Sequence, residues 1–304
     1  MHQRCIAIWE FCSNGCFYLG GITANRKGLL MKSKWIQISA LLLVLLFSSQ
    51  LHASNESLVE VETRPGVKQK FIIIEPDQPI AAVILFEGAH GGLDLYATSG
   101  KPGIKWGAEG FLARKRQSFT KHGFLVALID SPTDKKKMDA IWRMSSEHAE
   151  DIHSVIKTIK KQADVPIWVV GMSMGSFSAA STAIRLRSDI NGLIVVSSIT
   201  RSKKKWDIYP SHPKGIINMN YDTLLVPALI VTHKEDGCDL SPAEDAPALK
   251  DALINSQKVE VLYFTGGKKA KSKPCQSLSA HGFYGIEEEV VKAISEFIIN
   301  NSKK

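Results

Sequence analysis

Short apolar runs alternate with amphipathic stretches from about residue 68 to the end of the chain. Seven runs rich in apolar and β-branched residues, most of them bounded by turn-forming residues, predict strands. They are Lys68–Ile74, Ala81–Phe86, Phe124–Ile129, Ile167–Val170, Gly192–Ser197, Leu225–Thr232 and Val259–Phe264. The second run, AAVILF, is wholly apolar, which is typical of a strand that is buried on both faces.

Helical spacing of apolar residues marks the stretches between these runs. In Met144–Ala163, isoleucines and a valine recur at helical spacing from Ile152 to Ile159. The other predicted helices are Gly107–His122, the stretch from Gly175 to about Arg187, Ala246–Ile254 and Ile286–Ile299. Strands that alternate with helices indicate an α/β fold, with a mostly parallel, doubly wound sheet covered by helices on both faces. Functional groups of such a sheet are expected at the carboxyl ends of the strands.

Residues 54–304 are interpreted as one such domain, because no internal repeat or low-complexity linker interrupts them. The first segment of this domain, Ser54–Pro65, is polar and is predicted to be a mobile leader. Arg201–Thr223 is predicted to be irregular. The stretch between the strands at Gly192 and Leu225 is too short to hold a full helical lid, so we expect an open site without a large lid domain.

Residues 31–53 have the pattern of a secretory signal peptide. Two lysines precede a short apolar run, Ile38–Phe47, and small and polar residues follow it up to Ala53. We therefore expect cleavage after Ala53 and export to the periplasm or out of the cell. The apolar run is too short for a comfortable membrane span, so no stable span is expected after cleavage. A membrane-anchored form that retains the leader is the alternative.

Residues 1–30 are interpreted as an upstream extension or an artefact of start-codon choice, with Met31 as the true start. The three cysteines of this segment, Cys5, Cys12 and Cys16, fit no metal-binding spacing. The segment is therefore left out of the fold prediction.

Composition and charge narrow the class of partner. The chain is 44% hydrophobic and 22% charged, as expected for a protein with a packed core. Its formal net charge is +8, and residues 1–53 hold five basic residues against one acidic residue, so half of the excess lies there. The remaining excess is mild, and no basic helix or aromatic-basic motif accompanies it. These features argue against nucleic acid as a partner.

The segment Pro166–Ala180, PIWVVGMSMGSFSAA, carries the clearest chemical signal. A strand, a G-x-S-x-G turn and a helix follow one another, which is the context of a nucleophile elbow. Ser173 is expected to adopt a strained backbone conformation with its hydroxyl exposed. Gly171 and Gly175 remove the side chains that would collide where strand and helix pass closely. The alternative is a glycine-rich turn with an ordinary surface serine.

A serine nucleophile needs a base to take its proton and a third group to hold that base. Asp236 lies just past a predicted strand in a turn closed by glycine, and it is the predicted acid. Glu235 is its main rival and Asp239 a weaker one, and a solvated acidic turn is the alternative interpretation. His281 lies between the last strand and the last helix, is the only histidine after His233, and is the predicted base.

Two cysteines remain once residues 1–30 are set aside, Cys238 and Cys275. An even pair in an exported chain predicts a disulfide. It would close a loop of about 37 residues and contribute roughly 3–4 kcal/mol in the chain-entropy picture. It would also tie the loop of the predicted acid to the loop of the predicted base. Two unrelated buried thiols are the alternative.

Gly171–Gly175, Asp236 and His281 occur in the order nucleophile, acid, histidine, and this order resembles the α/β-hydrolase family over Lys68–Ile299. The resemblance implies about eight strands, and a strand near Leu58–Arg64 could supply the eighth. It also implies an oxyanion hole formed by the backbone N–H groups of Met174, after the nucleophile, and of Ala89, in the loop Gly88–Gly91. His90-Gly91-Gly92 resembles the family's H-G-G-G element only loosely.

The sequence therefore predicts an exported serine hydrolase that transfers an acyl group to water, with carboxylic esters as the leading substrate class. A peptidase, amidase or thioesterase of the same fold, or a non-catalytic binding protein that keeps the fold, are the alternatives. The partner is a small-molecule ester or amide. No cofactor and no metal are expected, because the spacing of His, Cys and carboxylates gives no zinc signature. Trp206, Tyr209 and Met174 could line an acyl or aromatic pocket, or could simply pack at the surface.

Overall fold

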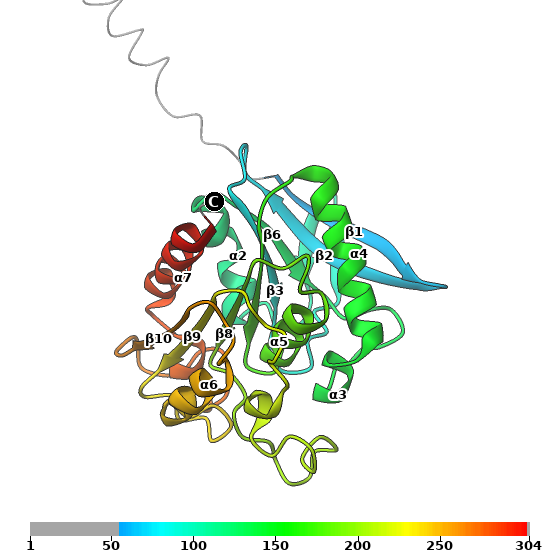
Figure 1. Cartoon of the computed structure of the whole chain (residues 1–304). Coiled ribbons are helices and arrows are strands. Elements are labelled where there is room, and N and C mark those ends of the chain that lie inside the picture. Colours follow the sequence, from blue (N-terminus) through cyan, green and yellow to red (C-terminus); the bar gives the residue numbers. More distant parts are fainter. Residues whose placement is uncertain (1–54, 303–304) are drawn as a thin grey trace, which may run out of the picture. The chain divides into compact units, whose positions relative to one another are not determined.

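The computed structural model describes residues 55–302. Its centre is an eight-stranded sheet in the order β1-β2-β6-β3-β7-β8-β9-β10 (Figure 1). These strands are β1 (Asn55–Arg64), β2 (Val67–Glu75), β6 (Phe124–Ile129), β3 (Ala81–Phe86), β7 (Ile167–Met172), β8 (Gly192–Val196), β9 (Ala228–His233) and β10 (Val259–Phe264). The pairs β1–β2 and β2–β6 are antiparallel, and all pairs from β6 to β10 are parallel. The predicted α/β fold with about eight strands is confirmed. The predictions for residues 1–53 lie outside the described residues.

Helices cover both faces of this sheet, and each face has its own apolar core (Figure 1). Helices α4 (Ser146–Gln162), α5 (Gly175–Arg185) and α6 (Ala246–Ala252) pack on one face, and α2 (Phe111–Lys121) and α7 (Glu287–Ser302) pack on the other. Along each central strand, successive side chains lie alternately in one core and in the other. Ile84 of β3 lies in the first core and Val83 in the second. Because β3 is buried along its whole length, its carboxyl end is a rigid base for the loop that follows it.

The segment predicted to be a mobile leader is instead largely an edge strand. β1 pairs with β2 from Asn55 to Arg64, so the prediction for Ser54–Pro65 was wrong in that range, and the suggested eighth strand is present. Val59 and Val61 of β1 pack against the first core, whereas the residues between them stay polar. The alternation of apolar and polar residues is the signal of a half-buried strand.

Two small elements near the site escape sequence analysis. A separate turn of helix, α3 (Ala140–Arg143), precedes the predicted helix Met144–Ala163, and Ser145 then caps α4 by accepting a hydrogen bond from the His148 N–H at 3.1 Å. A hairpin of β4 (Leu95–Thr98) and β5 (Lys101–Ile104) follows the β3 loop. Four-residue elements are too short to show periodicity.

Other boundaries shift by a few residues. The predicted helix Gly107–His122 begins at Phe111, and β9 begins at Ala228 rather than at Leu225, which is 59% exposed. Residues 197–227, between β8 and β9, contain one short 3-10 helix, Gly215–Asn218, among the elements that the structure describes. Within residues 55–302, no helix is long and apolar enough to cross a membrane.

His148 on α4 is a buried imidazole, and neither of its ring nitrogens has a hydrogen-bond partner among residues 55–302. Its ring lies edge-on to Phe86, with the centroids 5.8 Å apart. Burial, together with the positive charges of Arg143 and Arg64, lowers the pKa of His148 from 6.5 to about 3. The folded protein therefore keeps this histidine neutral at pH values near 7.

We expect this histidine to make the fold sensitive to acid. The unfolded chain takes up the proton near pH 6.5, whereas the folded chain resists it down to about pH 3. Above pH 6.5 the ring is neutral in both states and does not lower the free energy of unfolding. As the pH drops from 6.5 to about 3, the free energy of unfolding falls by up to about 1.4 kcal/mol per pH unit. Urea unfolding at several pH values should give a shallower pH dependence for His148→Leu. His153→Leu, on the same helix but partly exposed, is the control and should leave the slope unchanged; equal slopes for all three proteins would contradict the prediction.

Candidate active site

Ser173 stands on a sharp turn between β7 and α5. Its backbone φ is +52°, in the left-handed region that non-glycine residues seldom occupy. The Ser173 N–H donates to the Val196 carbonyl at 2.9 Å, which fixes the turn to the neighbouring strand. A Cβ at Gly175 would lie 2.0 Å from the Phe86 carbonyl oxygen, and a Cβ at Gly171 would lie 2.4 Å from that of Gly175. The two glycines therefore permit the close packing that the sequence predicts.

Asp236 and His281 are in direct contact at the ends of neighbouring strands. The Nδ1 atom of His281 lies 2.8 Å from Oδ2 of Asp236, and both side chains are almost fully buried. The Cys238 N–H donates to Oδ1 of Asp236 at 2.9 Å. The rival Glu235 is 62% exposed, and it accepts a hydrogen bond from the Gly266 N–H instead. The structure thus brings Asp236, and not Glu235, to the predicted base.

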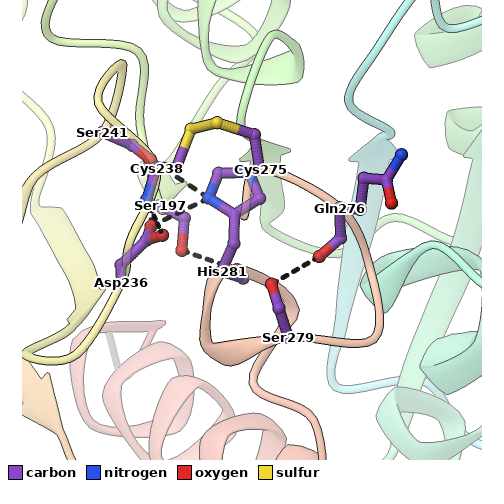
Figure 2. The surroundings of a disulfide bond; sticks show 8 residues. All are labelled: Ser197, Asp236, Cys238, Ser241, Cys275, Gln276, Ser279 and His281. Carbon is purple, nitrogen blue, oxygen red and sulfur yellow. Dashed lines mark hydrogen bonds and ion pairs between the residues drawn. A yellow bond between two sulfur atoms is a disulfide. The ribbon is translucent and has the colours of Figure 1, made fainter. Parts of the chain in front are cut away.

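Ser241 is a third member of this group that sequence analysis missed. Its hydroxyl donates to Oδ2 of Asp236 at 2.9 Å and lies 3.0 Å from Nδ1 of His281 (Figure 2). The carboxylate of Asp236 therefore accepts from a backbone N–H and a hydroxyl as well as from the ring. These contacts hold the carboxylate and the ring in a fixed orientation relative to each other. The spacing of five residues from Asp236 gave no signal of this contact.

Ser173 and His281 line the same cavity of about 110 Å³, together with Gly88, Ala89 and His90. Nε2 of His281 is buried and has no hydrogen-bond partner among residues 55–302, so Ser173 and His281 face one space without a hydrogen bond between them. Catalytic hydrogen bonds are often long in structures without substrate and tighten when it binds.

The loop after β3 lies directly against the serine. A Cβ at Gly88 would lie 3.1 Å from Cβ of Ser173, which is tighter than most such contacts, so glycine favours this close approach of the loop. The next residue, Ala89, has a φ of +48° and is exposed. Within the described part of the chain, the backbone N–H groups of Ala89 and Met174 donate to no protein acceptor. Both predicted oxyanion donors are therefore free to bind a ligand oxygen.

Arg143 supports this loop from below, and sequence analysis gave no indication of it. Its guanidinium is fully buried and donates to the carbonyl oxygens of Glu87 and Ala89 at 3.2 and 3.3 Å. It also donates to the Ser178 hydroxyl of α5 at 2.9 Å. Burial lowers the pKa of Arg143 to about 10, so the group stays charged at neutral pH. One side chain thus links the β3 loop to the helix that follows Ser173.

The two predicted disulfide partners lie together beside this group. The sulfur atoms of Cys238 and Cys275 are 1.95 Å apart, and their Cα atoms are 4.6 Å apart. Figure 2 shows the pair joining the loop of Asp236 to the loop of His281. Cys275 also lines the cavity that contains Ser173. Within residues 55–302, no cluster of three His, Cys, Asp or Glu side chains could hold a metal ion.

A mostly parallel eight-stranded sheet, a strained serine after a central strand, and a buried acid–histidine pair after later strands define an α/β-hydrolase. Comparison of the sequence with protein families agrees with this class. Residues 110–270, more than half of the chain, match the family described as serine aminopeptidase, S33, and the chain belongs to this family of hydrolases.

Solved structures similar to this chain are esterases and related hydrolases. An esterase of Pyrococcus furiosus has a TM-score of 0.58 and 17% identity, over 83% of this chain and 93% of that chain. Dienelactone hydrolase from Anabaena variabilis has a TM-score of 0.56 and 14% identity, over 83% of this chain and 100% of that chain. Est1E from Butyrivibrio proteoclasticus, in a structure with bound ferulic acid, has a TM-score of 0.55 and 16% identity, over 80% and 98%. At these identities the likeness establishes the fold. No curated protein matches the sequence.

We expect loss of the Cys238–Cys275 link to affect stability and rate together. Replacing both cysteines by serine removes a constraint worth about 3–4 kcal/mol and frees the loops that hold Asp236 and His281. Thermal unfolding should shift to lower temperature, and the rate of ester hydrolysis should fall while the amount of folded protein at the assay temperature stays constant. As a control, a reductant should slow hydrolysis by the original protein and leave the double variant unaffected, because the variant has no disulfide to reduce. Equal rates and unfolding temperatures would contradict the prediction.

Proposed function

We propose that this protein is an exported serine hydrolase that cleaves carboxylic esters through Ser173, His281 and Asp236. One observation carries the proposal. The Asp236–His281 pair is buried and hydrogen-bonded at 2.8 Å, His281 lines the same cavity as the strained Ser173, and Nε2 of His281 has no hydrogen-bond partner among residues 55–302. An oriented base and a nucleophile at one cavity are what acyl transfer requires, and this supports the proposal.

The chemistry follows from these positions. Nε2 of His281 takes the proton of the Ser173 hydroxyl, and the oxygen attacks the carbonyl carbon of the substrate. The tetrahedral oxyanion accepts hydrogen bonds from the N–H groups of Met174 and Ala89. His281 then gives its proton to the leaving alcohol, and an acyl group remains on Ser173. Water, activated by the same histidine, releases the acid and restores the serine.

Two findings bear on the kind of bond that is cleaved. The similar structures include esterases and a dienelactone hydrolase, which favours esters, whereas the family description names an aminopeptidase. An aminopeptidase must bind the free ammonium group of its substrate. The carboxylate that lines the serine cavity, Glu87, is buried and accepts hydrogen bonds from the N–H groups of Gly88 and Ala113. Burial also raises the pKa of Glu87, which weakens it as a partner for an ammonium group. We therefore place esters ahead of peptides.

We expect a fluorophosphonate to label Ser173 and to abolish hydrolysis of small esters. Ser173→Ala should lose both the adduct and the activity by at least about 10³-fold, because the nucleophile itself is removed. Mass spectrometry of the labelled peptide and a rate assay on esters and on amino-terminal amides check this. Ser154→Ala, a serine on the outer part of α4, is the matched control and should behave like the original protein. A folded protein that takes no label would favour a binding protein that keeps the fold.

We also propose that the protein acts outside the cytoplasm. The signal-peptide pattern of residues 31–53 supports this location, and so does the pairing of Cys238 with Cys275 beside the catalytic group, since disulfides persist in oxidising compartments. Expression of the whole sequence in an exporting bacterial host should yield a mature chain that begins at Ser54, as measured by intact mass. A mature protein that retains residues 31–53 would contradict cleavage and favour a membrane-anchored form.

A further inference from the structure

A second, larger cavity adjoins the oxyanion loop and has no part in the chemistry described so far. Its volume is about 470 Å³, which is within the usual range for small-molecule sites. Ala89 and Met174, the two predicted oxyanion donors, form the side of this cavity nearest to the serine. The opposite walls come from the segment around α3 and from Lys205–Ile208 in the connection between β8 and β9.

The reaction itself decides which part of an ester can enter this cavity. His281 must protonate the leaving oxygen, so the alcohol side of the substrate lies next to Nε2, in the 110 Å³ cavity that His281 lines. The carbonyl oxygen points to the N–H groups of Ala89 and Met174. The larger cavity is lined by both of these donor residues and not by His281, so it is the place that we assign to the acyl substituent.

The walls of this cavity are mainly apolar. Met138, Ala140 and Ile208 are each only 3% exposed, and Trp206 and Met174 are half-buried. Met138, Ala140 and Ile208 are therefore held firmly by the core, and the surface they offer suits a hydrocarbon or aromatic group rather than a polar one.

The charged groups at the rim offset one another. Lys137 and Lys205 are matched by Asp139 and Asp207, and all four side chains are exposed. Asp139 also serves as the cap of α3, accepting from the Trp142 N–H at 2.8 Å. The rim therefore gives no net attraction to a charged acyl group, and a charged group would lose its hydration on entering the apolar interior.

We infer that this cavity is the acyl-binding subsite of the enzyme, and that the substrates are esters of uncharged, apolar carboxylic acids several carbons long. This inference rests on the proposed function. Each methylene that enters an apolar cavity raises kcat/KM by roughly fourfold at most, until the cavity is filled. Preference among acids is thus set by the segment around α3 and by Trp206, and not by the residues that carry out the reaction.

The inference is tested with p-nitrophenyl esters that share one leaving group and differ in the acyl chain, from acetate to octanoate. The original protein should show kcat/KM rising with chain length beyond acetate. An ester of equal length whose acyl chain ends in a carboxylate should react at least about tenfold more slowly than its neutral counterpart, because the charge is desolvated.

Two variants at the wall provide the decisive comparison. Ile141 is 51% exposed and lines the cavity, so Ile141→Trp should narrow it without disturbing the fold, and Trp206→Ala should remove one wall. Both should lower kcat/KM for the longer esters several-fold and leave acetate hydrolysis almost unchanged. Ile254→Trp, at an isoleucine that is 80% exposed and does not line the cavity, is the matched control.

The outcomes separate this inference from the function on which it rests. The subsite inference fails if the acetate ester is cleaved in a Ser173-dependent way but longer acyl chains are not preferred. It also fails if the wall variants change the rates of all esters equally. In both cases the proposed hydrolase function is kept. If no ester is cleaved in a Ser173-dependent way, the proposed function fails and the subsite fails with it.

Discussion

The structure depends on how closely the turn at Ser173 approaches the end of β3. No side chain fits between Gly175 and the carbonyl oxygen of Phe86, where an added Cβ would be 2.0 Å away. This contact forces Ser173 into the left-handed conformation and sets the start of α5 against the central strand. It also brings the loop after β3 beside the serine, because Gly88 continues directly from the same strand. The predicted nucleophile and the predicted oxyanion donors therefore lie beside one close packing contact.

Two groups of buried polar contacts keep the site in this arrangement from opposite sides. Arg143 binds backbone carbonyls under the oxyanion loop, and its positive charge stands behind the place where negative charge would develop. Asp236, in the second group, accepts hydrogen bonds from Cys238, Ser241 and His281. A buried charge is costly unless its hydrogen bonds are satisfied, and each of these two groups has several partners. The cavity between them is thus bordered by rigid and polarised walls.

The parts of this fold that could be predicted from sequence are those buried on two faces. Ala81–Phe86 and Phe124–Ile129 were each predicted to the residue, because a central strand needs an apolar run of its own length. Val259–Phe264 was also predicted to the residue, although it is the partly exposed edge strand β10. The order of Ser173, Asp236 and His281 was readable because each follows a strand. Arg143 could not be found in this way, since its contact with Glu87 arises only when distant segments meet, and an arginine near a helix end usually faces solvent. Ser241 lies only five residues from Asp236, but the loop between them has no periodic pattern that would indicate the contact. The hairpin of β4 and β5 is half exposed and short, so its sequence resembles that of a loop.

Most walls of the larger cavity come from residues 137–141 and 205–208, which lie outside the main sheet, whereas Ser173 and Asp236 follow closely on β7 and β9. Substitutions at the exposed positions of these segments, such as Ile141 and Lys205, would therefore change the shape of the cavity while the sheet keeps its packing. Changes in substrate range can accumulate in evolution at little cost to folding under such a division. Related chains that share the serine turn and the acid–histidine pair can therefore differ in substrate, and these shared residues alone do not reveal the substrate of a given member.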